Sequence, residues 1–187
     1  MPTWAWIIIV VAAAILVAGA VAAYMARQNK TKGLRERFGP EYDRTVSERG
    51  KQREAEKELA ERERKREQLD IVPLTPEARQ KYAENWEDVQ TRFVDDPPNA
   101  VDEADRLVTD VMRERGYPMD DFDQRAADIS VDHPQVVENY RSAHGIYVRR
   151  QENGAGTEDL RQAFVHYRAL FDELLETREP AGQEARR

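Results

Sequence analysis

Residues 157–178, TEDLRQAFVHYRALFDELLETR, carry the clearest helical pattern of the chain. Thr157 is a typical N-cap residue. The apolar residues that follow recur every three or four positions, which places them on one face of a helix. They are Leu160, Phe164, Tyr167, Leu170, Phe171, Leu174 and Leu175. We therefore predict an amphipathic helix with one buried face, and a disordered tail over residues 179–187.

Three further segments with this pattern precede it. Thr75-Pro76-Glu77 predicts the start of a helix over 76–94. A second helix runs from Ala100 to Gly116, and a third starts at Ser130-Val131-Asp132-His133-Pro134. The acidic stretch 120–128 is expected to form one or two helical turns. No stretch alternates long enough to form a strand, so we predict an all-α fold with a small antiparallel helical bundle over 71–178.

Residues 27–70 are expected to form a basic juxtamembrane segment and a charged helical stalk. Leu34, Phe38, Tyr42 and Val46 recur every four residues, and Gly39-Pro40 predicts a break in this stripe. Beyond Gly50 the sequence is mostly Glu, Arg, Lys and Gln, which favour helix. Its few apolar residues are too sparse for a coiled-coil seam. We interpret this part as a solvated helix that holds the bundle off the membrane; the alternative is disorder.

Residues 4–26, WAWIIIVVAAAILVAGAVAAYMA, contain no charged side chain. A bilayer core of ~30 Å needs roughly 20 helical residues, so this stretch predicts a single transmembrane helix within a 1–26 anchor. The alternative is a cleaved signal peptide. Such peptides begin with basic residues and have a shorter apolar run, so we favour the anchor.

Basic side chains follow the apolar stretch and none precedes it. They are Arg27, Lys30, Lys32, Arg35 and Arg37. The positive-inside rule then predicts a cytoplasmic carboxyl-terminal region; export is the alternative. The same five side chains are candidate contacts for anionic lipid headgroups.

Charge is unevenly distributed over the 187 residues, whose net charge is −7. Residues 27–69 hold 14 basic and 10 acidic side chains, and residues 70–187 hold 15 basic and 26 acidic ones. An acidic body argues against nucleic acid as a partner, because phosphate binding needs a positive face. The absence of cysteine excludes disulfides and a cysteine nucleophile within this sequence.

Candidate chemical groups are few. His133, His144 and His166 lack the spacing of a zinc site. A second cluster consists of acidic residues, which fail the calcium-loop pattern and are interpreted as solvated helix caps: Asp120, Asp121, Asp123, Asp128 and Asp132. We predict no catalytic residue, cofactor or metal site. The one candidate ligand pocket would combine Tyr117, His133 and His144, within residues 117–147.

Several phrases of the sequence resemble an uncharacterised family of bacterial membrane-anchored helical proteins, often labelled "secreted". The phrases include LRERFGPEY at 34–42, Phe93-Val94-Asp95-Asp96-Pro97, Arg115-Gly116-Tyr117-Pro118 and Ser130-Val131-Asp132-His133-Pro134. The resemblance covers most of residues 34–150. It implies a bacterial origin and an anchored helical body, and it brings no activity or cofactor.

These observations lead to two functional hypotheses. The first is a membrane-tethered protein-interaction module, not an enzyme, whose partners are the lipid bilayer and another protein or a second copy of itself. The alternative is a ligand-binding or catalytic helical bundle with a site near residues 117–147. The bacterial cell membrane is the expected location.

Overall fold

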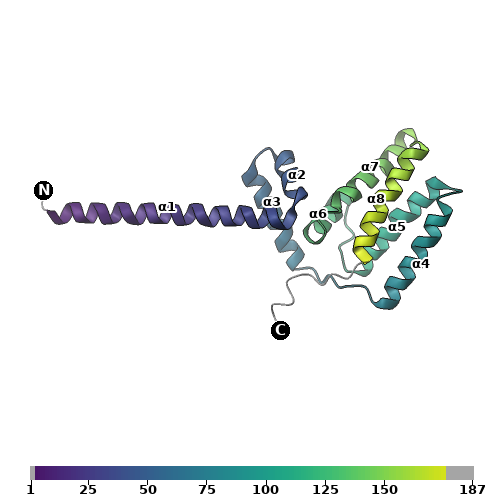
Figure 1. Cartoon of the computed structure of the whole chain (residues 1–187), viewed down its shortest axis with the longest axis horizontal. Helices are drawn as coiled ribbons and strands as arrows, with labels where there is room; N and C mark the ends of the chain where they lie inside the picture. The colour runs from purple at the N-terminus through teal and green to yellow at the C-terminus, as the bar shows by residue number, and fades with distance from the viewer. Residues whose placement is uncertain (1–2, 176–187) are drawn as a thin grey trace.

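The computed structural model of the chain describes the backbone of residues 3–175 and the side chains of residues 14–150 and 154–175. Over this part the chain forms eight helices and no strand, which confirms the all-α prediction. Figure 1 shows one long helix that extends from a cluster of shorter ones. The predicted tail over 179–187 lies outside the described residues.

The long helix, α1, runs from Thr3 to Phe38. At ~1.5 Å per residue its 36 residues span about 54 Å. The described side chains from position 14 to position 30 are all exposed, and Thr31 is the first that the rest of the chain partly covers. Among its described side chains, helix α1 therefore joins the remaining helices through its carboxyl-terminal end (Figure 1).

Among the residues whose side chains the structure describes, no helix combines the length and the apolar character that a membrane crossing requires. The span predicted over 4–26 includes residues 4–13, whose side chains lie outside the described ones.

The predicted break at Gly39-Pro40 is confirmed. Helix α1 ends at Phe38 and α2 covers Pro40–Arg49. Gly39 has φ +47°, in the left-handed region that favours glycine, and Pro40 supplies the first residue of α2. A second reversal at Gly50 leads into α3, Gln52–Glu67. The chain thus changes direction twice, at Gly39 and at Gly50, on either side of α2.

Helix α3 confirms the helical prediction for the charged segment, but the expectation that it stands alone in solvent is wrong. Ala55 and Leu59 are 0% exposed. Leu59 belongs to a small core that connects α1, α2, α3 and α6, made of Leu34, Phe38, Tyr42, Leu59 and Val131, with Val46 packed against it. The reversals at Gly39 and Gly50 cause the difference, because they bring the apolar stripe of 34–46 onto α3. We call α2, α3 and residues 31–38 of α1 the base.

The bundle lies beyond the base and contains the larger core, as predicted. It comprises α4 (Pro76–Arg92), α5 (Pro97–Glu114), α6 (Phe122–Asp132), α7 (Val137–Asn153) and α8 (Thr157–Leu175). The Thr75 hydroxyl accepts a hydrogen bond from the Ala78 amide, as its predicted capping role requires. Trp86 stacks on Phe164 and Phe171, with ring centroids 5.1 and 4.5 Å apart. Aromatic packing between α4 and α8 therefore forms one side of the core.

The boundary between α6 and α7 differs from the prediction. Helix α6 has 11 residues and extends through Asp132, so Ser130 to Asp132 end one helix instead of starting the next. The His133 amide still donates to the Ile129 carbonyl at 2.8 Å. Pro134 disfavours helical backbone in the residue before it, so His133 leaves the helix and α7 begins at Val137.

Candidate functional site

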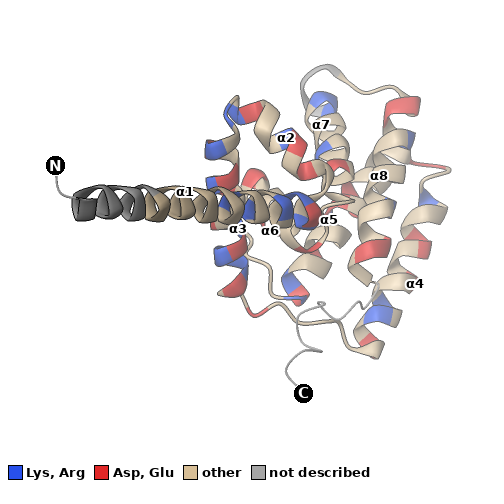
Figure 2. Cartoon of the chain, turned by 60° about the vertical axis from the view of Figure 1, so that its left-hand side comes forward, with Lys and Arg blue, Asp and Glu red and all other residues tan. Residues whose placement is uncertain are grey.

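A basic cleft of about 400 Å³ lies between α1 and α3, where α1 leaves the base. Its lining carries five cationic side chains and one carboxylate: Arg27 and Lys30 from α1, and Arg53, Glu56, Lys57, Ala60 and Arg64 from α3. Figure 2 shows the blue segments of Lys and Arg on the part of α1 nearest the body and along α3. We call this the α1–α3 cleft.

The one carboxylate of the cleft, Glu56, is buried, and one of its oxygens, Oε1, accepts three hydrogen bonds. It accepts hydrogen bonds from Thr31 Oγ1 at 2.8 Å, from Tyr42 Oη at 3.0 Å and from Gln52 Nε2 at 2.7 Å. Burial raises the pKa of Glu56, but the hydrogen bonds from Gln52, Thr31 and Tyr42 outweigh it and the pKa is lowered. Glu56 thus stays ionised and fixes α1 to α3 through neutral donors.

Only two of the five predicted headgroup residues, Arg27 and Lys30, line the cleft. The other three pair with acidic side chains. Lys32 lies 3.7 Å from Glu36, Arg35 lies 3.2 Å from Asp43, and Arg37 lies 2.5 Å from Glu63. The structure adds Arg53, Lys57 and Arg64 to the lining. The sequence does not indicate them, because they follow Lys30 by more than 20 positions and lie in a segment rich in charges of both signs.

A second polar site surrounds Glu41 of α2, whose side chain is 1% exposed. Arg141 of α7 donates to both carboxylate oxygens at 2.7 and 2.9 Å, Arg62 of α3 donates at 2.7 Å, and Arg44 donates at 3.0 Å. Burial raises the pKa of Glu41, but the hydrogen bonds from Arg141, Arg44 and Arg62 outweigh it and lower the pKa to about 2. Three arginines from three helices therefore meet on one buried carboxylate.

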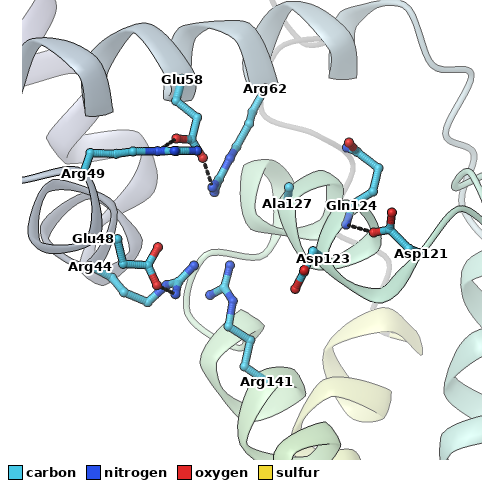
Figure 3. Close-up of a pocket in the computed structure, with 10 residues that line it drawn as sticks. All are labelled: Arg44, Glu48, Arg49, Glu58, Arg62, Asp121, Asp123, Gln124, Ala127 and Arg141. Atoms are coloured by element: carbon cyan, nitrogen blue, oxygen red, sulfur yellow. Dashed lines mark hydrogen bonds and ion pairs between the residues drawn. The ribbon is translucent and has the colours of Figure 1, made fainter.

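An open cleft of about 570 Å³ adjoins Glu41. In Figure 3 the side chains of Arg44, Arg62 and Arg141 extend towards one another from α2, α3 and α7. The charges of the lining balance, with four arginines and four acids: Arg44, Glu48, Arg49, Glu58, Arg62, Asp121, Asp123, Gln124, Ala127 and Arg141. Arg44 also pairs with Glu48, and Arg49 and Arg62 both pair with Glu58. We therefore interpret this cleft as an ionic junction that holds the base on the bundle.

The structure brings together two of the three residues of the candidate ligand pocket. Tyr117 is buried, and its hydroxyl donates to Asp132 at 3.0 Å. His133 contacts Glu173 through Nδ1 at 3.1 Å and Arg115 through Nε2 at 3.4 Å. Burial raises the pKa of Tyr117 and lowers that of His133. Both rings therefore serve a packed polar network where α5, α6 and α8 meet.

His144 belongs to a different set of contacts. Its ring stacks on Phe122 with centroids 3.6 Å apart, and Tyr147 follows at 6.0 Å. Burial lowers the pKa of His144. The third histidine, His166, contacts Asn139 through Nδ1 at 2.9 Å. The histidines thus occupy three separate environments.

The acidic cluster of residues 120–132 is only partly a set of solvated caps. Asp121 accepts a hydrogen bond from the Gln124 amide at 2.9 Å, as an N-cap does. Asp128 is 2% exposed and pairs with Lys65 at 3.2 Å, and Asp132 pairs with Arg66. The prediction was wrong for these two because α3 packs on α6. Within the described part of the chain, no group of three or more histidine and acidic side chains is arranged to hold a metal ion.

Comparisons of the chain with protein-family models, with curated proteins and with solved structures gave no match.

Proposed function

We propose that the chain is a membrane-tethered helical module. Residues 4–26 cross a bilayer once, and the acidic bundle is presented in the cytoplasm to another protein or to a second copy of the chain. The observation that carries this proposal is the exposed apolar surface of α1.

Large apolar side chains of α1 stand in solvent on the helix that extends from the base. Exposed fractions range from 52% to 74% at Ile15, Leu16, Val17, Val21, Tyr24 and Met25. Leaving apolar area in water costs about 25 cal/mol per Å², so an apolar surrounding is favoured for this segment. The uncharged stretch continues over residues 4–26, which is long enough for a helix to cross a bilayer core. A helix that is apolar on all sides is typical of a membrane-embedded segment, so lipid is the environment that we infer for it.

The base supports the tethering role because it connects α1 firmly to the bundle. Glu56 bonds to Thr31 of α1, and Arg37 of α1 pairs with Glu63 of α3. Helix α3 in turn pairs with α6 through Lys65 and Asp128. A bundle held in this way stays close to the membrane surface. Its net acidic charge suits a basic partner surface.

Membrane extraction tests the tether. A charge at the centre of a transmembrane helix costs about 2.5–3.5 kcal/mol, so Ile15→Arg with Leu16→Arg should release the chain from membranes. Val94 and Val165 are also exposed, 82% and 52%, but lie on the bundle, so Val94→Arg with Val165→Arg is the matched control. We expect the wild type and the control in the pellet after high-pH extraction and the α1 variant in the supernatant. A wild type that is released by this treatment overturns the tether.

Two measurements test the remaining parts of the proposal. A reporter that is active only after export, fused after Arg187, should stay inactive if the bundle is cytoplasmic; activity overturns this orientation.

Cross-linking of the full chain in its native membrane should yield a defined heteromeric or homomeric product. A chain that stays monomeric and uncross-linked under these conditions overturns the interaction role.

A further inference from the structure

We propose that the α1–α3 cleft is a binding site for the phosphate group of an anionic phospholipid. This inference rests on the proposed tether, because the tether places the cleft beside a bilayer. The sequence predicts α3 only as a spacer; here we assign it a role in lipid binding.

The cleft has an unbalanced charge. Its five cationic side chains face one carboxylate, Glu56, which gives a net charge of +4. The three hydrogen bonds that Glu56 accepts, all through Oε1, come from neutral donors and not from the cations of the cleft. Within the described part of the chain, no carboxylate lies within ion-pair distance of Arg27, Lys30 or Arg53. Among the described residues, Lys57 is the one cation of this lining that has an acidic partner, the exposed Glu61 at 3.9 Å. In the cleft beside Glu41, by contrast, all four arginines pair with acids of the chain itself.

The height of the cleft matches that of lipid headgroups. The apolar stretch ends at Ala26, so Arg27 is the next residue, and Lys30 lies about 6 Å beyond Ala26 along the helix at ~1.5 Å per residue. The polar layer on each side of a bilayer core is roughly 5–8 Å thick. Arg53, Lys57 and Arg64 reach the same cleft from α3. The five cations therefore converge where the phosphates of a bilayer lie.

The side chains of the cleft suit a phosphate ester. Three of the five cations are arginines, whose planar guanidinium groups donate two parallel hydrogen bonds to phosphate oxygens. The two lysines add point charges. A zwitterionic headgroup would bring its own cation into a site of net positive charge, so an anionic phospholipid is favoured over a choline lipid.

Binding of short-chain lipids to the purified full chain in neutral detergent tests the site without requiring a bilayer. The probes are dihexanoyl phosphatidylglycerol, dihexanoyl phosphatidylcholine and inorganic phosphate, measured by native mass spectrometry and by 31P NMR. The test variant is Arg53→Gln, Lys57→Gln, Arg64→Gln. The control is Lys81→Gln, Arg149→Gln, Arg168→Gln, which removes the same charge from exposed positions of the bundle.

We expect phosphatidylglycerol to bind the wild type and the control equally and to bind the test variant at least tenfold more weakly. The physical basis is that each basic side chain contributes about 1 kcal/mol towards an anionic surface, or about fivefold per charge. Equal weakening in both variants overturns the site, because net charge alone would explain it. Competition by inorganic phosphate that matches phosphatidylglycerol, or equal binding of phosphatidylcholine, overturns the lipid assignment.

The membrane fraction of the test variant separates this inference from the tether. If the span holds the chain in the bilayer, the variant stays in the pellet after high-pH extraction while its lipid binding falls. Release of the wild type from membranes overturns the tether. Lipid binding in detergent that is unchanged by the three substitutions overturns only the proposed lipid site in the cleft.

Discussion

Glu41 and Arg141 are separated by 100 positions in the sequence and form an ion pair with two hydrogen bonds, 2.7 and 2.9 Å long, between α2 and α7. The Glu41 carboxylate also binds Arg62 and Arg44. Because its side chain is 1% exposed, this contact has little competition from water. The position of the base on the bundle therefore depends on a buried charge.

Removal of that charge should be strongly destabilising. Glu41→Ala leaves three arginines facing one another, and the loss of one partner from a buried ion pair typically costs about 3–5 kcal/mol. We expect a decrease of this size in the free energy of unfolding, measured by urea denaturation of the full chain in mild detergent. Glu87→Ala, at an exposed position of α4, is the matched control and should change stability by less than about 0.5 kcal/mol. A similar, small effect of both substitutions would contradict the buried charge.

Acid should weaken the same junction. The pKa of Glu41 is about 2 in the folded chain and 4.5 in the unfolded reference, so the unfolded chain takes up the proton first as pH falls. The stabilisation is complete above pH 4.5 and disappears as the pH falls through 2. At 1.36 kcal/mol per pKa unit, the 2.5 units between these values amount to about 3 kcal/mol. Between pH 6 and pH 2 the wild type should lose about that much more stability than Glu41→Gln, and parallel pH curves would contradict it.

The sequence predicts the bundle well because each helix carries its own pattern. Leu160, Phe164 and Tyr167 recur at helical spacing and are buried as that spacing requires. Thr75 and Pro76 mark the start of α4 where the structure has it. Such signals are local, since a cap or an apolar stripe involves residues a few positions apart.

The ionic junction and the α1–α3 cleft could not be predicted in the same way. Glu41 is one of 36 acidic residues, and nothing near it in the sequence indicates Arg141 as its partner. In the charged segment 51–69, Leu59 has no large apolar residue nearer than Leu69, and its packing partners come from α1, α2 and α6. Contacts between distant segments depend on the two chain reversals. The direction in which the chain turns at each of them cannot be predicted from the periodicity of the helices.

The glycine at the end of α5 should resist substitution. Gly116 has φ +93°, and a Cβ atom there would lie 2.5 Å from the Asp70 carbonyl oxygen. Strained backbone of this kind costs about 1–3 kcal/mol, so Gly116→Ala should lower the melting temperature by several degrees. Gly145→Ala in α7 is the control, because its Cβ would meet only Arg149 Nη1 at 3.6 Å and alanine favours helix. An equal effect of the two substitutions on thermal unfolding would contradict the close approach at Gly116.

Leu59 distinguishes a packed α3 from a solvated stalk. A lone leucine on a solvated helix could be shortened at almost no cost, whereas Leu59 is 0% exposed and packs among Phe38, Tyr42 and Val131. Leu59→Ala should therefore destabilise the base by about 2–5 kcal/mol, since a cavity remains where the side chain was. Val94→Ala, at a position that is 82% exposed, is the control. Hydrogen exchange measures the effect directly: amides of α3 should lose protection in Leu59→Ala and keep it in Val94→Ala. Unchanged protection of α3 in both variants would contradict the conclusion that packing of Leu59 holds this helix against the base and α6.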